Sequence, residues 1–261
     1  MLDHHPYPTD LTEKQWAIIA PLFPPAKKLG RQRADLRRIF DAILYLLRTG
    51  CAWRMLPHDF SKWRTVYGHY REWTQTGLLE QILHVLRATD RVQEGRSSEP
   101  TAAILDSQSI RTTEGGEARG YDAGKKITGR KRHLLVDTDG RLLSAAVGSA
   151  SIQDRQAALP LISKEGSFHS HLRCLWADGG YAGALIQQIA RLPRRRPLRL
   201  QIVPRSRKPG FHVLPRRWVV ERTISWLMRY RRLRADYERL TAHSCSMIIL
   251  AMIHLLLKRL A

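Results

Sequence analysis

The sequence predicts an α/β protein in which a mixed sheet carries helices on its faces and a small all-α domain precedes it. Two observations lead to this fold class. Within the first 90 residues, apolar side chains recur at helical spacing in four short segments, and after residue 100 short apolar runs alternate with helical patterns. Residues 91–100 are polar, as expected of a linker. We therefore expect a helical domain at 1–90 and a second domain at 101–261.

The N-terminal part is expected to form a small bundle of the helix-turn-helix type. Its third helix is rich in aromatic residues and follows a proline-interrupted turn, so Lys62 and Arg64 stand where such proteins contact phosphates, although a solvated face explains them equally well. The second helix stops at Gly50, a residue type common at helix C-termini. The four helices are expected within 8–22, 33–49, 51–77 and 78–86.

The part after residue 100 reads as strand, hairpin, helix, strand, helix, strand and helix. Asp139 and Gly140 predict the turn of the hairpin. This order is typical of a mixed α/β sheet. Strands are expected within 101–109, ending at Asp106, at 131–149 (the hairpin), within 173–181, ending at Asp178, and at 198–204. Helices are expected at 151–162, 182–192 and 218–240.

The charge of the chain indicates a polyanionic partner. The sequence has 44 Lys and Arg against 23 Asp and Glu, a formal charge of +21, which favours nucleic acid first and an acidic membrane surface second. No apolar run approaches the roughly 20 residues that span a bilayer, and the N-terminus lacks the regions of a signal peptide. We therefore expect a soluble cytoplasmic protein that does not use a membrane.

The cysteines do not predict a disulfide or a metal site. Cys51, Cys174 and Cys245 are odd in number and far apart, and no CxxC pair is present. We expect all three to be ordinary core residues with free thiols.

Three carboxylates stand out by position. Asp106 and Asp178 each end a predicted strand, and open α/β sheets place their sites at that edge, while Glu221 lies in a helix that otherwise carries mostly arginine. Each has a plainer explanation, because a strand-end aspartate often caps a turn and a glutamate among arginines often forms a surface ion pair. Spacing alone does not exclude four other aspartates, Asp122, Asp137, Asp139 and Asp154.

Three acidic side chains that converge from two strands and a helix can hold two hard divalent cations. Oxygen donors of this kind suit Mg²⁺ or Mn²⁺. Such a pair of ions activates the attacking oxygen and stabilises the leaving oxygen at a phosphodiester, and it also offsets the repulsion between the carboxylates and a DNA backbone. The sequence therefore predicts metal-dependent phosphodiester chemistry.

Several stretches resemble the DDE transposases of bacterial insertion sequences, most closely the group named after insertion sequence five. This resemblance implies a ribonuclease-H-like catalytic domain behind a helical N-terminal domain. The similar stretches cover almost the whole chain and read LTEKQWAIIAPLFPP, RTGCAWRMLPHDFSKWRTVYGHYREW, ILDSQSI, KKITGRKRHLLVDTDGRLL, WADGGYAG and RRWVVERTISWLMRYRRLRADYE.

In that family one Asp follows the first strand, a second opens an Asp-x-Gly/Ala-Tyr/Phe motif, and the Glu lies in a Tyr-x2-Arg-x3-Glu-x6-Lys signature. The resemblance implies that Asp106, Asp178 and Glu221 bind the metal ions and that Arg217 is the arginine of the signature.

The chain departs from this signature at two positions. Leu214 stands where the family has Tyr, and Met228 stands where it has Lys, with Arg229 one residue later. A shift of register by one residue would let Arg229 take the role of the Lys.

Basic residues near these motifs are candidate DNA ligands. Residues 191–240 hold sixteen Arg or Lys against three acidic residues, a density that favours contact with an anionic backbone, although a single charged residue is more often solvated. The candidates are Lys62, Arg64, Lys125, Lys126, Arg130, Arg132, Arg217, Arg222, Arg229, Arg231 and Arg232.

These observations together favour a transposase that binds the inverted-repeat ends of an insertion sequence, cleaves the DNA and joins the 3′-hydroxyl ends to target DNA with Mg²⁺ or Mn²⁺. It is expected to act on double-stranded DNA as a homodimer or larger assembly in the bacterial cytoplasm, near the nucleoid. The alternatives are a ribonuclease-H-like nuclease that cuts without joining, a non-enzymatic DNA-binding protein, and a phosphatase with an aspartate nucleophile. The last is disfavoured because DSQS lacks a second Asp two residues after the first.

Overall fold

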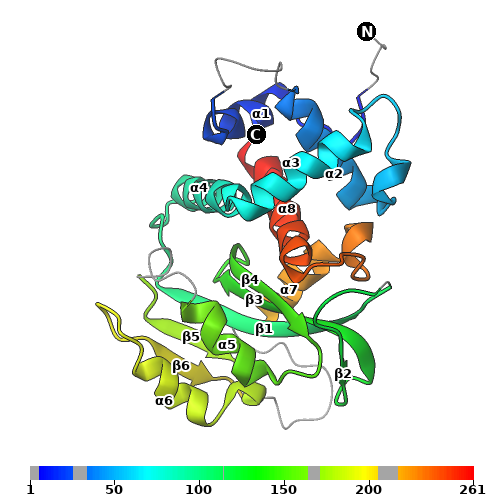
Figure 1. Cartoon of the computed structure of the whole chain (residues 1–261). Helices are drawn as coiled ribbons and strands as arrows, with labels where there is room; N and C mark the ends of the chain where they lie inside the picture. Colours follow the sequence, from blue (N-terminus) through cyan, green and yellow to red (C-terminus); the bar gives the residue numbers. More distant parts are fainter. Residues whose placement is uncertain (1–5, 26–33, 114, 164–170, 205–216) are drawn as a thin grey trace.

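The computed structural model describes residues 6–25, 34–113, 115–163, 171–204 and 217–261. A curved sheet carries helices on both faces, and further helices lie beyond one of these faces (Figure 1). The predicted mixed α/β architecture is therefore confirmed.

The sheet combines antiparallel and parallel pairing around its central strand, β1. On one side of β1 lies β3, which pairs with β1, β2 and β4 in antiparallel fashion; on the other side lie β5 and then β6, both parallel to β1. The strands are β1 (Ala102–Arg111), β2 (Gly120–Asp122), β3 (Ile127–Asp137), β4 (Leu142–Ser149), β5 (Cys174–Ala177) and β6 (Arg199–Ile202).

The first strand does not end at Asp106, as the sequence suggested, but continues to Arg111. It continues because β3 begins at Ile127, earlier than expected, and pairs with β1 as far as Arg111 and Gly129. Gly129 permits this close approach, since a Cβ atom there would lie 2.0 Å from the carbonyl oxygen of Ile110. The polar half of β1 is therefore a strand because its backbone pairs with β3, and not because its sequence has an apolar pattern.

The helices confirm several predicted ends and correct others. Thr12 forms a capping box with Gln15, and Gly50 ends its helix in the left-handed conformation with φ of 76°. The helix expected at 218–240 ends at Leu227, and the one expected at 78–86 continues to Gln93, into the expected linker. The helices are α1 (Glu13–Ile19), α2 (Leu36–Thr49), α3 (Trp63–Gln75), α4 (Leu78–Gln93), α5 (Asp154–Ser163), α6 (Ala184–Ala190), α7 (Trp218–Leu227) and α8 (Thr241–Leu260).

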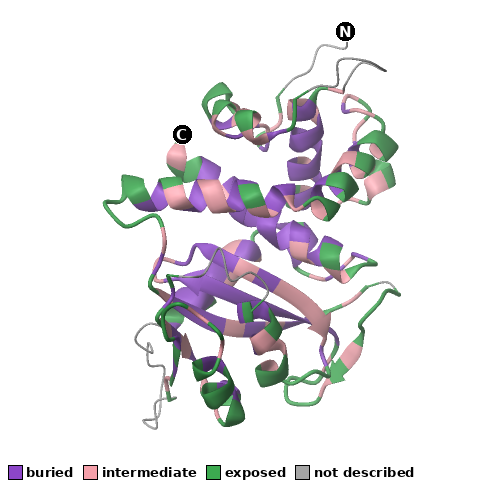
Figure 2. Ribbon diagram, turned by 60° about the vertical axis from the view of Figure 1, so that its left-hand side comes forward, coloured by how far each residue is buried: buried purple, intermediate pink, exposed green. Residues whose placement is uncertain are grey.

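The C-terminal helix α8 lies between the N-terminal helices and the sheet (Figures 1 and 2). It contacts α1 to α4 on one side and β4 and α7 on the other. A single apolar cluster includes Phe40 of α2, Leu79 of α4, Leu134 of β3 and Leu250 of α8, each at most 1% exposed. The division into domains at 1–90 and 101–261 stays a prediction, but the core crosses the expected boundary.

By length and composition α8 is also a helix that could cross a membrane, the only such helix in the described part of the chain. The expectation that no apolar run approaches 20 residues is therefore corrected. Most of the apolar window, 72%, is buried inside the protein. A helix surrounded by protein is apolar on all its faces for the same reason as a membrane span, so α8 is accounted for as a core helix.

A cluster of buried charges joins α4 to the turn between β3 and β4. Arg141 is fully buried, and its guanidinium contacts acidic groups from both elements. Arg91 of α4 contacts the same turn, with 2.6 Å between its Nη1 and Oδ2 of Asp137. Removing one member would leave charges buried without a partner, so the cluster fixes the helices relative to the hairpin. The carboxylates around Arg141 are those of Asp90, Glu94, Asp137 and Asp139.

Asp41 of α2 gives a testable pH dependence of stability. It is 2% exposed, it accepts a 2.9 Å hydrogen bond from the backbone N–H of Leu11, and burial raises its pKa to about 6. Because the folded chain binds this proton more tightly than the unfolded chain, stability falls as the pH rises from about 4 through 6. We expect Asp41→Asn, which keeps the acceptor oxygen, to stabilise the protein by about 3 kcal/mol at pH 8 and by about half of that at pH 5.

Urea unfolding at the two pH values measures this difference. Asp35→Asn is the control, because Asp35 is exposed and an asparagine still caps α2, so no pH-dependent gain is expected. An equal gain for Asp41→Asn at both pH values would contradict the assignment.

Candidate active site

The pairing of β1 with β5 brings Asp106 and Asp178 to the same edge of the sheet. Ile104 is the last residue of β1 that pairs with β5, and its partner is Trp176. Each aspartate lies two residues beyond this pair, and residues two apart on a strand face the same side. Both carboxylates therefore lie just past the end of β5, as predicted, even though β1 itself continues.

Arg217, the residue that precedes α7, lies between the two carboxylates. Its Nη2 is 3.6 Å from Oδ2 of Asp106 and 3.8 Å from Oδ2 of Asp178. The arginine is buried, and its Nε has no hydrogen-bond partner among the described residues. One guanidinium thus offsets the charge of both aspartates at the face of the sheet that α7 covers.

The two aspartates are held differently. Burial raises the pKa of Asp106, the neighbouring charge of Asp178 raises it further, and a 2.7 Å hydrogen bond from the N–H of Ser107 together with Arg217 opposes the rise. Oδ1 of Asp178 accepts a 2.9 Å hydrogen bond from the N–H of Gly180, which closes a turn directly after β5. A carboxyl group with a raised pKa at a strand edge is typical of functional sites.

Glu221 lies on α7, four residues or about one turn after Arg217. Its side chain is exposed, and within the described ranges no hydrogen bond or ion pair of its carboxylate is present. The described residues also contain no group of three His, Cys, Asp or Glu side chains close enough to hold a metal ion. The structure therefore brings two of the three predicted carboxylates together, and the convergence of all three stays a prediction.

The opposite face of β1 carries a second polar group that sequence reasoning did not single out as a site. Oδ1 of Asp154, the first residue of α5, accepts a 2.8 Å hydrogen bond from Ser107 and lies 3.1 Å from Nζ of Lys131. Lys131 is buried and also donates to the carbonyl of Ile152. Beside it His133 is 1% exposed, and burial lowers its pKa to about 4. The sequence signals for this group were Asp154, which spacing alone did not exclude, and a lysine placed between two arginines.

Three of the predicted DNA ligands are buried and bound to protein groups. Arg130 is 1% exposed, and its guanidinium donates to the backbone carbonyls of Glu117, Glu238 and Arg239. In the same way, Arg132 donates to the carbonyl of Leu233, and Arg232 pairs with the carboxylate of Glu238. These contacts correct the expectation for Arg130, Arg132 and Arg232, because their side chains do not face solvent. Arg130 and Arg132 connect β3 to the segment before α8, and Arg232 binds Glu238 within that segment.

The remaining candidates are accessible to different degrees. Arg222 is half-buried, with its guanidinium 4.5 Å from the ring centroid of Trp218 and 4.7 Å from that of Trp226. Arg217 is buried and its guanidinium contacts the two aspartates. Leu214, which stands at the tyrosine position of the family signature, lies outside the described residues. The exposed candidates are Lys62, Arg64, Lys125, Lys126, Arg229 and Arg231.

Comparison with known families agrees with this arrangement of motifs. A family model described as "Transposase DDE domain" matches residues 97–256, which is more than half of the chain and includes all three carboxylates. The chain belongs to the DDE transposase family. A second model, "Putative transposase of IS4/5 family", matches residues 11–83. The residues between the two matches, 84–96, overlap the expected linker at 91–100.

Two curated relatives of this family come from Burkholderia cepacia. The "Putative transposase for insertion sequence element IS402" is 34% identical over 118 residues, which cover 42% of this chain and 54% of the relative. The "Insertion element IS402 uncharacterized 16.2 kDa protein" is 32% identical over 121 residues, 42% of this chain and 78% of the relative. The chain thus spans about half the length of the first of these relatives. No solved structure matches significantly.

The Arg217 contacts predict how stability responds to pH in this family member. Arg217→Gln leaves two neighbouring carboxylates without their buried cation, and we expect a loss of about 3 to 5 kcal/mol at pH 8. At pH 5 the loss should be smaller, because burial raises the pKa of Asp106 and removal of the cation raises it further, so that a proton replaces the lost charge.

Urea unfolding at pH 5 and pH 8 tests this expectation. Arg217→Lys, which keeps a cation at the position, serves as the control and should lose less than the glutamine variant at pH 8. Equal losses for Arg217→Gln at both pH values would show that the arginine does not offset the charge of these aspartates.

Proposed function

We propose that this chain is a transposase that binds the inverted-repeat ends of an insertion sequence, cleaves the DNA there and joins the 3′-hydroxyl ends to target DNA. The observation that carries the proposal is the approach of Asp106 and Asp178, from separate strands, to one guanidinium at the edge of the sheet next to α7. Membership of the DDE transposase family and a formal charge of +21 support the same conclusion.

We also infer that the sheet is ribonuclease-H-like. The support is topological, because a long central strand has an antiparallel hairpin on one side and two parallel strands, reached through α5 and α6, on the other. In this arrangement the first aspartate comes from β1 and the second from the end of β5. Glu221 then enters from the helix that packs beside β1.

The residues present fit a site for divalent cations. The donors are carboxylate oxygens, which are the ligands that Mg²⁺ and Mn²⁺ prefer. In addition, the negative charges of Asp106 and Asp178 already attract one cation, the guanidinium of Arg217, to the place between them, which supports a cation site there. We therefore propose that Asp106, Asp178 and Glu221 hold Mg²⁺ or Mn²⁺.

When bound, such ions supply Lewis-acid activation of the attacking and leaving oxygens of a phosphodiester. Asp106 and Asp178 provide a rigid base for the site, because both are anchored by backbone hydrogen bonds at a strand edge. Arg217 offsets their charge, and its guanidinium would be available to bind a phosphate where divalent cations held by these carboxylates supplied that positive charge instead. Glu221 is on an exposed face, where substrate and cation can reach it.

The partner in this proposal is double-stranded DNA, both at the element ends and at the target. The exposed residues Lys62, Arg64, Lys125, Lys126 and Arg231 are proposed to contact phosphates, and Arg229 is proposed to replace the signature lysine. Joining two ends requires two active sites, so the working species is a homodimer or a larger assembly on DNA. A cytoplasmic, nucleoid-associated location belongs to the same proposal.

Cleavage of the DNA that flanks the gene of this chain tests the proposal. We expect nicking at the element ends that requires Mg²⁺ or Mn²⁺ and falls by about 100-fold or more in Glu221→Gln, since loss of a metal ligand raises the activation barrier by several kcal/mol. Glu72→Gln is the matched control, because Glu72 is an exposed glutamate on α3, remote in sequence from the candidate site. DNA binding in a gel-shift assay should be similar for all three proteins.

A strand-transfer assay with precut ends separates the alternatives. Joined product supports a transposase, whereas hydrolysis without joined product indicates a nuclease that only cuts. DNA binding that persists without any metal-dependent nicking, in the wild type as in Glu221→Gln, would indicate a non-enzymatic DNA-binding protein.

A further inference from the structure

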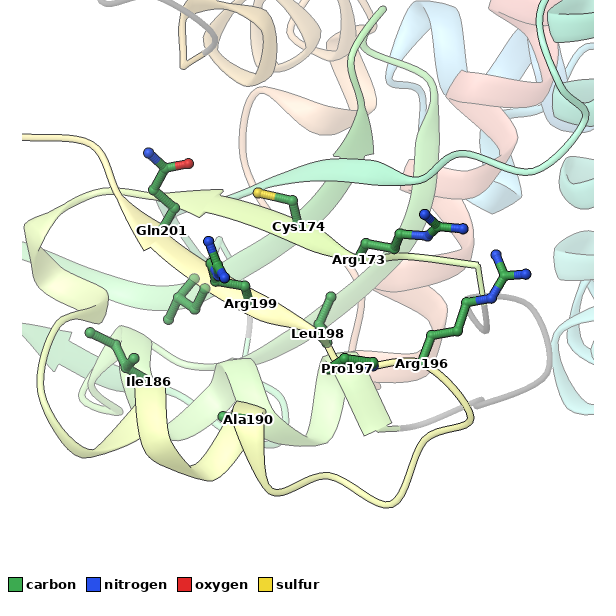
Figure 3. A pocket seen from close by; sticks show the side chains of 10 residues that line it. Arg173, Cys174, Ile186, Ala190, Arg196, Pro197, Leu198, Arg199 and Gln201 are labelled. Atoms are coloured by element: carbon green, nitrogen blue, oxygen red, sulfur yellow. The ribbon is translucent and has the colours of Figure 1, made fainter.

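The outer edge of the sheet carries a groove that none of the motifs above includes. It has a volume of about 740 Å³ and lies along β6, between the start of β5 and helix α6 (Figure 3). Its lining includes Arg173, Arg196 and Arg199 together with Ile186 and Gln201. In Figure 3 the side chains of Arg173 and Arg196 extend toward the same end of the groove, and Arg199 projects from β6 itself.

The charge of this edge is one-sided. Residues 171–204 contain six arginines and a single acidic residue, Asp178. Arg173, Arg196 and Arg199 are all exposed, and none forms an ion pair within the described part of the chain. This contrasts with Arg130 and Arg141, whose guanidinium groups are buried and satisfied by protein oxygens. Arginines that cluster without any carboxylate repel each other unless an external anion offsets their charge.

The groove lies close enough to the candidate active site for one duplex to reach both. Arg199 pairs with Cys174 at the start of β5, and Asp178 follows the end of that strand. Four residues of extended chain separate Cys174 from Asp178, a distance of about 13 Å. One turn of B-DNA is about 34 Å long, so a duplex held at Asp178 can place phosphates of the same turn in the groove.

We propose that the β6 groove, formed by Arg173, Arg196 and Arg199, is a second binding site for the phosphate backbone of double-stranded DNA. This inference rests on the proposed function, because it takes DNA as the polyanion that the groove binds. Contacts to phosphates carry no sequence information, so the groove would hold a duplex of any sequence beside the candidate active site. Among the described residues it would supply contacts that the motif-based candidates do not.

The salt dependence of binding to a duplex of unrelated sequence tests the proposal. The logarithm of the affinity falls with the logarithm of the salt concentration by about 0.9 for each phosphate contact. We expect Arg196→Gln/Arg199→Gln to reduce the slope by about 1.8 relative to the wild-type protein, measured by fluorescence anisotropy with a labelled 30-base-pair duplex between roughly 50 and 300 mM KCl. The loss should be the same on a duplex that carries the element end.

The control variant removes the same charge elsewhere. Lys14→Gln/Arg155→Gln changes one exposed residue on α1 and one on α5, neither of which lines the groove, and its slope should equal that of the wild type. Thermal unfolding of both double variants shows whether the fold is intact. The single variant Arg173→Gln tests the groove independently, and we expect it to reduce the salt slope by about 0.9.

Two results overturn the proposal. An unchanged salt slope in Arg196→Gln/Arg199→Gln overturns it directly. If this variant instead loses binding to phosphatidylserine vesicles, the groove binds a membrane, and if its oligomeric state changes, the groove binds another protein chain. A slope that falls equally in the control variant also overturns the proposal, since it would reflect net charge alone. Failure of the catalytic proposal is distinguishable, because Glu221→Gln would leave nicking unaffected while the salt slopes still report on the groove.

Discussion

The burial of α8 is the packing constraint on which the rest of the structure depends. This helix is apolar on nearly all sides, and exposing it to water would cost roughly 25 cal/mol for each Å² of its apolar surface. The N-terminal helices cover one side and β4 covers another, while α7 packs at its flank. Because α7 carries Arg217 at its start and Glu221 in its first turn, the position of α8 also sets where these residues meet the sheet.

The same constraint explains why the helical N-terminal part is attached by more than a linker. A continuous apolar core joins α2 and α4 to the sheet through α8, and the buried charges around Arg141 fix α4 to the hairpin. A buried arginine surrounded by carboxylates tolerates little movement, since any separation leaves charges unpaired in a medium of low polarity. The orientation of the N-terminal helices relative to the candidate active site is therefore set by packing and by charge together.

Charge also divides the arginines of this chain into two classes that the sequence cannot separate. Arg130, Arg132 and Arg232 bind carbonyl or carboxylate oxygens inside the protein, whereas Arg173, Arg196 and Arg199 face solvent along the β6 groove. Only the exposed class can offset the phosphates of a polyanion. Some of the basic residues behind the net charge of +21 are therefore buried in the protein. For this reason the basic clusters in the sequence do not show which basic side chains are exposed and available to DNA.

The sequence by itself determined the mixed α/β class and the family, because apolar periodicity and short motifs are local properties of the chain. It also singled out three carboxylates, whose joint role stays a prediction. Gly50 ends its helix and Gly140 forms the hairpin turn, as their local chemistry predicted. Only the tertiary structure decided that β1 continues past Asp106, that Arg217 lies between Asp106 and Asp178 while Glu221 faces solvent, and that α8 is a core helix. These outcomes depend on strand pairing, on burial and on which charges meet, all of which join residues that are distant in the sequence.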